Sequence, residues 1–319
     1  MDNNNRPLLA HLSILSACIF WGLMSPLGKD AMTHGIDGID MVSMRVVGGA
    51  ALFWLTSLFI KGEKVAVRDR FMFCLAGIFG LVFNQCCFTI GLNITSPINA
   101  SIVTTSMPIF AMLLAAVILR EPITGKKAIG VATGCCGAVI LILTSATSGG
   151  DSKVGDIRGD LLCMGAQLSY ALYLSLFNKL VKRYNAITVN KWMFLWATVL
   201  IIPFASPHLA ATDWAAVPVK TWLETGFVVF FGTYISYLLM MVALSTLRPT
   251  VVSIYNYMQP VTAVAVSLLA GIAVFKWSQG VAIALVFAGV ALVTKSKSRR
   301  DIEQKPGENL AEDTTGKAN

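Results

Sequence analysis

Two stretches of the chain, 96–110 and 248–262, carry small polar side chains and prolines at helical spacing within apolar sequence. In a helix of 3.6 residues per turn, positions i, i+3 and i+7 share one face. The residues on this face are Ser101, Thr104 and Pro108 in the first stretch and Ser253, Asn256 and Pro260 in the second. Hydroxyl and amide groups can hydrogen-bond a polar solute, and each proline frees a backbone carbonyl or provides a bending point. The pattern favours a ligand-binding surface on these two helices.

The two stretches repeat one pattern. A shift of 152 residues lays Pro97 on Pro249 and Ser101 on Ser253 without a gap. A match at a fixed offset indicates that the two halves of the chain are built alike. A second interpretation stays open, in which the hydroxyl groups bond to their own helix and the prolines only kink it.

The composition places most of the chain in lipid. Of its 319 residues, 55% are hydrophobic and only 13% are charged, whereas soluble domains average about 25% charged residues. Ten apolar runs approach the roughly 20 residues that a helix needs to cross a bilayer. These runs are 9–32, 39–60, 71–92, 96–119, 126–145, 159–181, 187–206, 221–246, 250–272 and 277–295. We therefore expect an all-α integral membrane protein with ten transmembrane helices.

Five spans in each half is an odd number, so the second half would enter the membrane with the opposite orientation. We expect two inverted five-helix repeats, at residues 1–148 and 159–296, joined by an extracytoplasmic linker at 149–158. The last segment, 297–319, is expected to be a disordered cytoplasmic tail. Inverted repeats are common in secondary transporters, where the substrate site lies near the membrane midplane between the repeats.

The distribution of basic residues predicts the topology. With the N-terminus in the cytoplasm, most of the 25 Lys and Arg residues fall on the cytoplasmic side, as the positive-inside rule requires. Both termini are then cytoplasmic, and the net charge of +8 needs no nucleic-acid partner to explain it. We expect a multi-pass protein of a bacterial inner (plasma) membrane, monomeric or homodimeric, whose partners are a small-molecule substrate and the lipid bilayer.

Several short motifs follow one another in an order typical of one family. They are Trp21-Gly22, Arg45, the region of Pro108, Leu119-Arg-Glu-Pro122, and Gly130 with Gly137. In these motifs the chain resembles the drug/metabolite transporter superfamily, EamA type. The resemblance implies ten spans in two five-helix repeats and export of a metabolite. The second half departs from the pattern, since Tyr170-Ala171 stands where Trp-Gly would repeat and Ala273 where Glu121 would. This departure argues against a role that needs the glutamate in both halves.

Further polar and aromatic side chains lie on helix faces that would line a central cavity. Besides Ser101, Thr104, Ser253 and Asn256, the predicted substrate-binding residues are Trp21, Asn84, Phe88, Gln167, Tyr170, Tyr234, Tyr237 and Gln259. Aromatic walls with scattered amide and hydroxyl groups suit an amphipathic organic solute better than an inorganic ion. Helix packing or an interfacial belt is the alternative interpretation of the aromatic residues.

Two basic residues lie within spans, at equivalent depths in the two halves. Arg45 and Lys191 could each reach the nearest interface with a long side chain. Otherwise Arg45 could bind a substrate carboxylate or close an outer gate with Asp40. The residues to which we assign a gating or hinge role are Arg45, Pro108, Glu121, Lys191 and Pro260.

No acidic residue and no histidine lies near the middle of a predicted span, although proton-coupled transporters usually place one on the path. The sequence therefore predicts facilitated efflux or weakly coupled exchange, with coupling through Glu121 as the alternative. His11, His34 and His208 lie at span edges and give no metal cluster. We expect no catalytic residue, no metal and no cofactor.

Four functions compete for this pattern. An exporter of a small organic metabolite, amino-acid-like or amphipathic, working by alternating access through a central cavity, is favoured. An organophosphate or nucleotide-sugar exchanger would need several basic residues around the cavity. An intramembrane enzyme would need paired acids, a His-x-x-x-His run or a Ser/Lys dyad at depth, and the sequence has none. A membrane scaffold or assembly protein would bind no solute.

Overall fold

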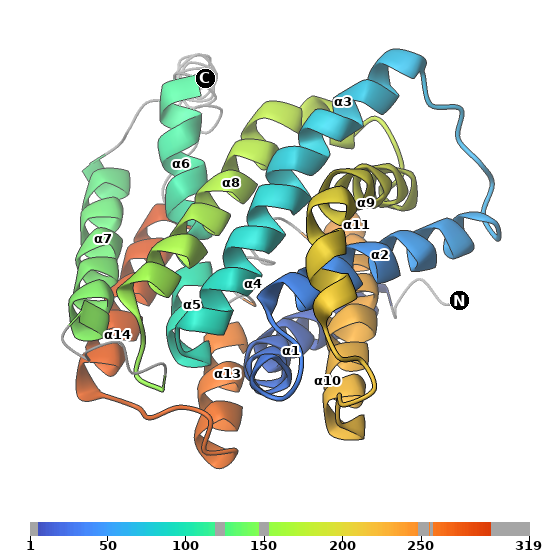
Figure 1. Cartoon of the computed structure of the whole chain (residues 1–319). Helices are drawn as coiled ribbons and strands as arrows, with labels where there is room; N and C mark the ends of the chain where they lie inside the picture. The colour runs from blue at the N-terminus through green and yellow to red at the C-terminus, as the bar shows by residue number, and fades with distance from the viewer. Residues whose placement is uncertain (1–5, 119–124, 147–152, 248–254, 256–257, 295–319) are drawn as a thin grey trace, which may run out of the picture.

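The computed structural model describes residues 6–118, 125–146, 153–247, 255 and 258–294. These residues form helices, turns and short loops, with no strand among them. The expected all-α class is therefore confirmed for this part of the chain (Figure 1). Each of the ten apolar runs expected from the sequence contains a described helix.

The helices of the two halves follow one another in the same order. Those of the first half are α1 (Arg6–Thr33), α2 (Gly38–Ser57), α3 (Val67–Gly77), the π-helical turn η1 (Ile78–Phe83), α4 (Asn84–Ile94), α5 (Pro97–Thr104), α6 (Met107–Ile118) and α7 (Gly125–Ala146). Those of the second half are α8 (Ile157–Val181), α9 (Ala186–Ala211), α10 (Val219–Val229), the π-helical turn η2 (Phe230–Ile235), α11 (Ser236–Thr246), α13 (Met258–Leu269) and α14 (Trp277–Thr294).

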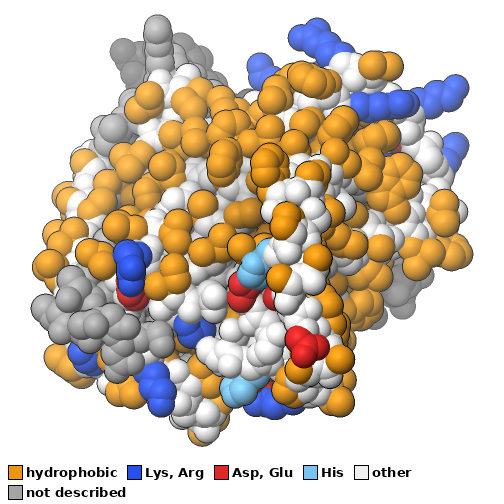
Figure 2. Space-filling view, in the orientation of Figure 1, with side chains coloured by type: hydrophobic (Ala, Val, Ile, Leu, Met, Phe, Trp, Pro, Cys, Tyr) orange, Lys and Arg blue, Asp and Glu red, His pale blue; other side chains and the backbone are white. Residues whose placement is uncertain are grey.

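Seven helical segments of the described chain are long and apolar enough to cross a membrane. They are Leu8–Thr33, Gly38–Ser57, Val67–Ile94, Pro97–Leu114, Ile157–Phe177, Ala186–Ala211 and Val219–Ala243. The shorter apolar helices are Ala128–Leu141, Met258–Leu269 and Trp277–Gly289. Large apolar side chains such as Phe204 and Leu269 are 87% and 89% exposed, and apolar side chains cover most of the face in Figure 2. Exposed apolar surface on this scale suits contact with lipid.

The internal repeat is visible in the helix boundaries. The segments α3, η1 and α4 each begin 152 residues before α10, η2 and α11, which is the offset found in the sequence. Both halves thus carry a π-helical turn at the same position of a long span. Such turns widen the helix locally and often occur at functional sites.

In each π-helical turn, one backbone carbonyl accepts a hydrogen bond from a side chain of the other half. Trp21 Nε1 of α1 donates to the Gly232 carbonyl of η2 at 3.0 Å, and Ser169 Oγ of α8 donates to the Phe79 carbonyl of η1 at 2.7 Å. In agreement with these bonds, α1 packs mainly on α10, α11 and α13, whereas α8 packs mainly on α4, η1 and α6. The first helix of each half therefore packs within the other half.

The span expected over 96–119 is not one continuous helix. It divides into α5, which ends at Thr104, and α6, which begins at Met107. Pro108 has no N–H group to donate to the carbonyl four residues earlier. At the break the hydroxyl groups of Thr104, Thr105 and Ser106 each donate to the carbonyl three residues before them, at 2.6 to 2.7 Å. The polar face predicted from the sequence thus lies at a break in the helix.

Glycines permit the closest helix contacts. A Cβ atom on Gly159, at the start of α8, would lie 2.6 Å from the carbonyl oxygen of Gly91 on α4. A Cβ atom on Gly289 of α14 would lie 2.5 Å from the carbonyl oxygen of Gly130 on α7. Because the obstacle is backbone in both cases, these crossings require a residue without a side chain.

Gly159→Ala should lower the thermal stability of the purified protein, by about 1–3 kcal/mol, because the added methyl group overlaps a backbone carbonyl. Gly165→Ala is the matched control, since it lies on the same helix and its added Cβ has no atom within 4 Å. Alanine also favours the helix over glycine. Thermal melting in detergent measures both variants, and equal melting temperatures would contradict the required close contact.

Candidate functional site

A cavity of about 180 Å³ lies between the two halves of the molecule. Its lining comes from α1, α2 and α4 to α6 of the first half and from α8, α11 and α13 of the second. The lining residues are Trp21, Met24, Ser25, Arg45, Asn84, Gln85, Phe88, Ser101, Thr104, Thr105, Met107, Gln167, Tyr170, Tyr237, Met240 and Gln259. Aromatic rings and Met side chains alternate with amides, hydroxyls and one guanidinium, so the cavity can hold a solute with both apolar and polar parts.

Most of the substrate-binding residues predicted from the sequence surround this cavity. Those in its lining are Trp21, Asn84, Phe88, Ser101, Thr104, Gln167, Tyr170, Tyr237 and Gln259. Tyr234 does not line it, because its hydroxyl is hydrogen-bonded to Thr56 and its ring packs on Phe53. Ser253 and Asn256 lie outside the described residues. The substrate-binding role of this set stays a prediction.

The predicted gating residues that the structure describes do not gather at one place. Arg45 lines the cavity, whereas Pro260 is buried in α13 outside the lining. Lys191 also lies outside the lining, with Nζ 5.1 Å from the centre of a tryptophan ring of α2. Pro108 belongs to the helical backbone of α6, and Glu121 lies outside the described residues. Their gating roles also stay predictions.

Arg45 is the one charged side chain in the described lining of the cavity, and it is only 6% exposed. Its Nε donates to Thr233 Oγ1 at 3.2 Å, and its Nη1 donates to Thr89 Oγ1 at 3.1 Å. The side chain therefore points inward and does not extend to an interface. Arg45 is not paired with Asp40 in this structure, where the Asp40 carboxylate accepts from Thr212. Two neutral hydroxyls hold the guanidinium in place.

The hydroxyl groups of α5 serve their own helix as donors. Ser101 Oγ donates to the Ile98 carbonyl at 2.8 Å, and Thr104 Oγ1 donates to the Ser101 carbonyl at 2.7 Å. As donors, these two hydroxyls therefore follow the second interpretation given above, in which they bond to their own helix. Each oxygen still has lone pairs that can accept a hydrogen bond from a solute in the cavity.

Gln85 lines the cavity but was not among the predicted binding residues. It is 2% exposed, and neither Nε2 nor Oε1 has a hydrogen-bond partner of ordinary geometry within the described chain, although the Tyr237 hydroxyl lies close. Buried amides are normally paired. The signal that could have identified Gln85 is an amide group in the middle of an apolar run, directly after Asn84.

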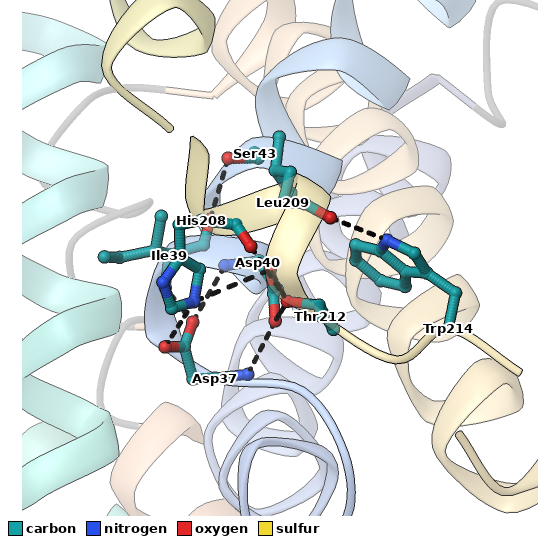
Figure 3. A network of polar contacts seen from close by, with 8 residues as sticks. All are labelled: Asp37, Ile39, Asp40, Ser43, His208, Leu209, Thr212 and Trp214. Carbon is teal, nitrogen blue, oxygen red and sulfur yellow. Dashed lines mark hydrogen bonds and ion pairs between the residues drawn. The ribbon is translucent and has the colours of Figure 1, made fainter. Parts of the chain in front are cut away.

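A second polar network joins the start of α2 to the end of α9 (Figure 3). Asp37 and Asp40 form a capping box at the first turn of α2. His208 Nε2 lies 2.7 Å from Asp37 Oδ2, and Thr212 Oγ1 donates to Asp40 at 3.1 Å. The sequence predicted no metal cluster at His208, whereas the structure brings one potential ligand atom from each of Asp37, Asp40 and His208 within 4.8 Å. Through these contacts the network, which we call the His208 clamp, links the start of α2 to the end of α9.

A buried polar cluster joins the N-terminal ends of α5, α8 and α14. Thr95 Oγ1 and Asn99 Nδ2 donate to the Asp160 carboxylate at 2.6 and 3.1 Å. Gln279 Nε2 donates to Asn99 Oδ1 at 2.6 Å. All four side chains are buried. The sequence analysis missed this cluster, because its members come from three separate runs and share no short motif.

A cysteine at position 104 should react with a hydrophilic, membrane-impermeant thiol reagent, because a polar cavity of this size admits water. The experiment uses protein whose seven native cysteines are replaced. Thr133→Cys is the matched control, since Thr133 makes the same type of bond within its own helix, to Ile129, outside the cavity. Mass spectrometry measures the rate of labelling. Faster labelling at position 133 than at position 104 would contradict a cavity open to water.

Comparisons with known proteins give a family, several relatives and a shared fold. The model of the EamA-like transporter family matches residues 8–143 and 157–295. The chain is 22% identical over 287 residues to the uncharacterized transporter YyaM of Bacillus subtilis (strain 168), covering 89% of this chain and 93% of the relative. It is 23% identical over 294 residues to the uncharacterized transporter YetK of the same organism, covering 92% and 88%. A protein of known crystal structure shares the fold with a TM-score of 0.61 at 18% identity, covering 89% of this chain and 95% of its own.

Proposed function

This chain belongs to the EamA-like transporter family, and we propose that it exports a small organic metabolite, amino-acid-like or amphipathic, by alternating access. The family and the names of its relatives indicate a membrane transporter and not an enzyme. The observation that carries the proposal is the cavity, because its lining draws on both halves of the chain. A site shared by two repeats can open to either side when one repeat moves against the other.

The proposal includes ten spans in two inverted five-helix repeats. It is supported by the 152-residue offset between α3–α4 and α10–α11 and by the three shorter apolar helices, which lie at the places of the remaining spans. The excess of basic residues on one side supports cytoplasmic termini in a bacterial inner membrane. The lipid bilayer and the solute are the proposed partners, and the protein acts as a monomer or homodimer.

Two other functions fit the cavity less well. An organophosphate or nucleotide-sugar exchanger needs several cations around the phosphate groups, but Arg45 is the one basic residue in the described lining, and Lys191 lies elsewhere. A scaffold function would not explain a polar cavity, bounded by aromatic rings, between the two halves.

Thr104→Phe should abolish export, because the phenyl ring would occupy the cavity while the lost hydroxyl bonds only to its own helix. Metabolite profiling compares the medium of cells that overproduce the wild type, this variant or neither. We expect at least one metabolite to accumulate in the medium only with the wild type.

Thr133→Phe is the control for this experiment, since it adds the same ring on α7 outside the cavity. It should export as the wild type does, at equal protein levels in the membrane. Identical media from the wild-type and Thr104→Phe cells would contradict transport through this cavity.

Efflux should depend little on a pH gradient. The described lining contains no Asp, Glu or His, so no side chain there is suited to carry a proton at neutral pH. The measurement is efflux of the identified metabolite from proteoliposomes, with and without an imposed pH gradient and with the membrane potential clamped. Strong acceleration by the gradient would contradict uncoupled efflux and would direct attention to Glu121.

A further inference from the structure

We infer that the cavity is an anion site that binds a monocarboxylate, with Arg45 as its charge partner and Gln85 as a second hydrogen-bond donor. This inference rests on the proposed function and narrows its substrate class. Both side chains line the cavity and both are buried. Together they supply a cation and an amide N–H group at one place.

Arg45 carries a buried positive charge that no described side chain neutralises. Its guanidinium donates to two hydroxyls, those of Thr233 and Thr89, and no carboxylate of the described residues pairs with it. A guanidinium group has five N–H donors, of which these contacts use two. A buried charge without a counter-ion is costly, and an incoming anion would remove that cost. The remaining donors are suited to the two oxygen atoms of a carboxylate.

The two hydroxyls fix the direction of the guanidinium. Thr233 Oγ1 donates its own proton to the Val228 carbonyl at 3.1 Å, so its lone pairs are directed to Arg45. Thr233 lies in η2, and the wider π-helical turn allows this bond to a carbonyl five residues earlier. Thr89 holds Arg45 from α4, which belongs to the first half. Arg45 is thereby positioned by both halves of the chain before any solute binds.

Gln85 provides the independent observation. Its amide nitrogen and oxygen are buried in the lining without a hydrogen-bond partner of ordinary geometry in the described chain. Buried amide groups are normally hydrogen-bonded, so a solute in the cavity could pair with these two atoms. The amide nitrogen can donate to the second face of a carboxylate, and the amide oxygen can accept from a hydroxyl or amide on the solute.

The single positive charge in the described lining indicates which charge a bound solute should carry. One cation and no acid in the described lining favour a single negative charge over a cation, which would be repelled, and over a phosphate dianion, which needs more than one basic partner. Trp21, Phe88, Tyr170 and Tyr237 supply apolar surface for the rest of the molecule. The substrate class is therefore a monocarboxylate with an apolar or aromatic body.

Binding to the full-length protein in detergent tests this inference with three probes that share one body. The probes are 3-phenylpropionate, its neutral primary amide, and 3-phenylpropylamine as the cation, each titrated by calorimetry. We expect the carboxylate to bind at least tenfold more tightly than the amide, and the amine to bind most weakly. Arg45→Gln should weaken carboxylate binding on the order of 10- to 100-fold and leave amide binding unchanged, as loss of a charge-assisted hydrogen bond predicts.

Two further variants complete the test. Gln85→Leu removes an amide that makes no hydrogen bond of ordinary geometry within the described chain, so it should fold normally and weaken carboxylate binding severalfold more than amide binding. Lys179→Gln is the control, because it removes an exposed basic side chain outside the described lining, and it should leave the binding of all three probes unchanged. If Arg45→Gln fails to fold, Gln85→Leu and the order of the three probes decide the outcome.

The inference is overturned if the carboxylate fails to bind, if it binds no better than the amide, or if folded Arg45→Gln keeps the preference. Each of these results stands whatever the export experiment gives. Conversely, carboxylate binding that depends on Arg45, together with identical media from wild-type and Thr104→Phe cells, would refute the proposed export and leave the anion site in place.

Discussion

In lipid, backbone carbonyl groups that leave the regular helical pattern must find a donor within the protein. The two π-helical turns create this need at equivalent places of the two halves. Trp21 from α1 satisfies one turn and Ser169 from α8 satisfies the other, so each first helix is bound to the far half of the chain. The cavity follows from this exchange, because the faces that meet there belong to helices from both halves.

The repeat is symmetric in its helices and asymmetric in its chemistry. Arg45 and Lys191 hold equivalent positions in sequence, yet Arg45 is fixed inside by Thr89 and Thr233, while Lys191 lies over Trp54. The repeat thus places a basic residue at equivalent positions of both halves, but of these two only Arg45 lies in the cavity lining. The single guanidinium of Arg45 makes the cavity positively charged, and the symmetric helix arrangement by itself would not do so.

The sequence was sufficient for features that depend on composition and helical spacing. The family, the all-α class and the positions of the apolar helices follow from apolar runs and ordered motifs, and the polar residues of α5 could be assigned to one face because they recur at i and i+3. A bending point at Pro108 was expected, but a complete break between α5 and α6 was not, nor were the hydroxyl bonds at Thr105 and Ser106 that accompany it. The vacancy at Gln85 and the clamp at His208 were also missed, since both depend on which distant residues come close in space.

The exchange of first helices also has a consequence for biosynthesis. The chain enters the membrane from its N-terminus, so α1 is inserted long before α10, η2 and α11, its main partners, have been made. During that interval the Trp21 indole has no access to the Gly232 carbonyl that accepts its proton in the finished molecule. The first half therefore reaches its final packing only after the second half has been inserted. The cavity cannot be complete before α13, which carries Gln259, has been made, so a shorter nascent chain cannot contain it.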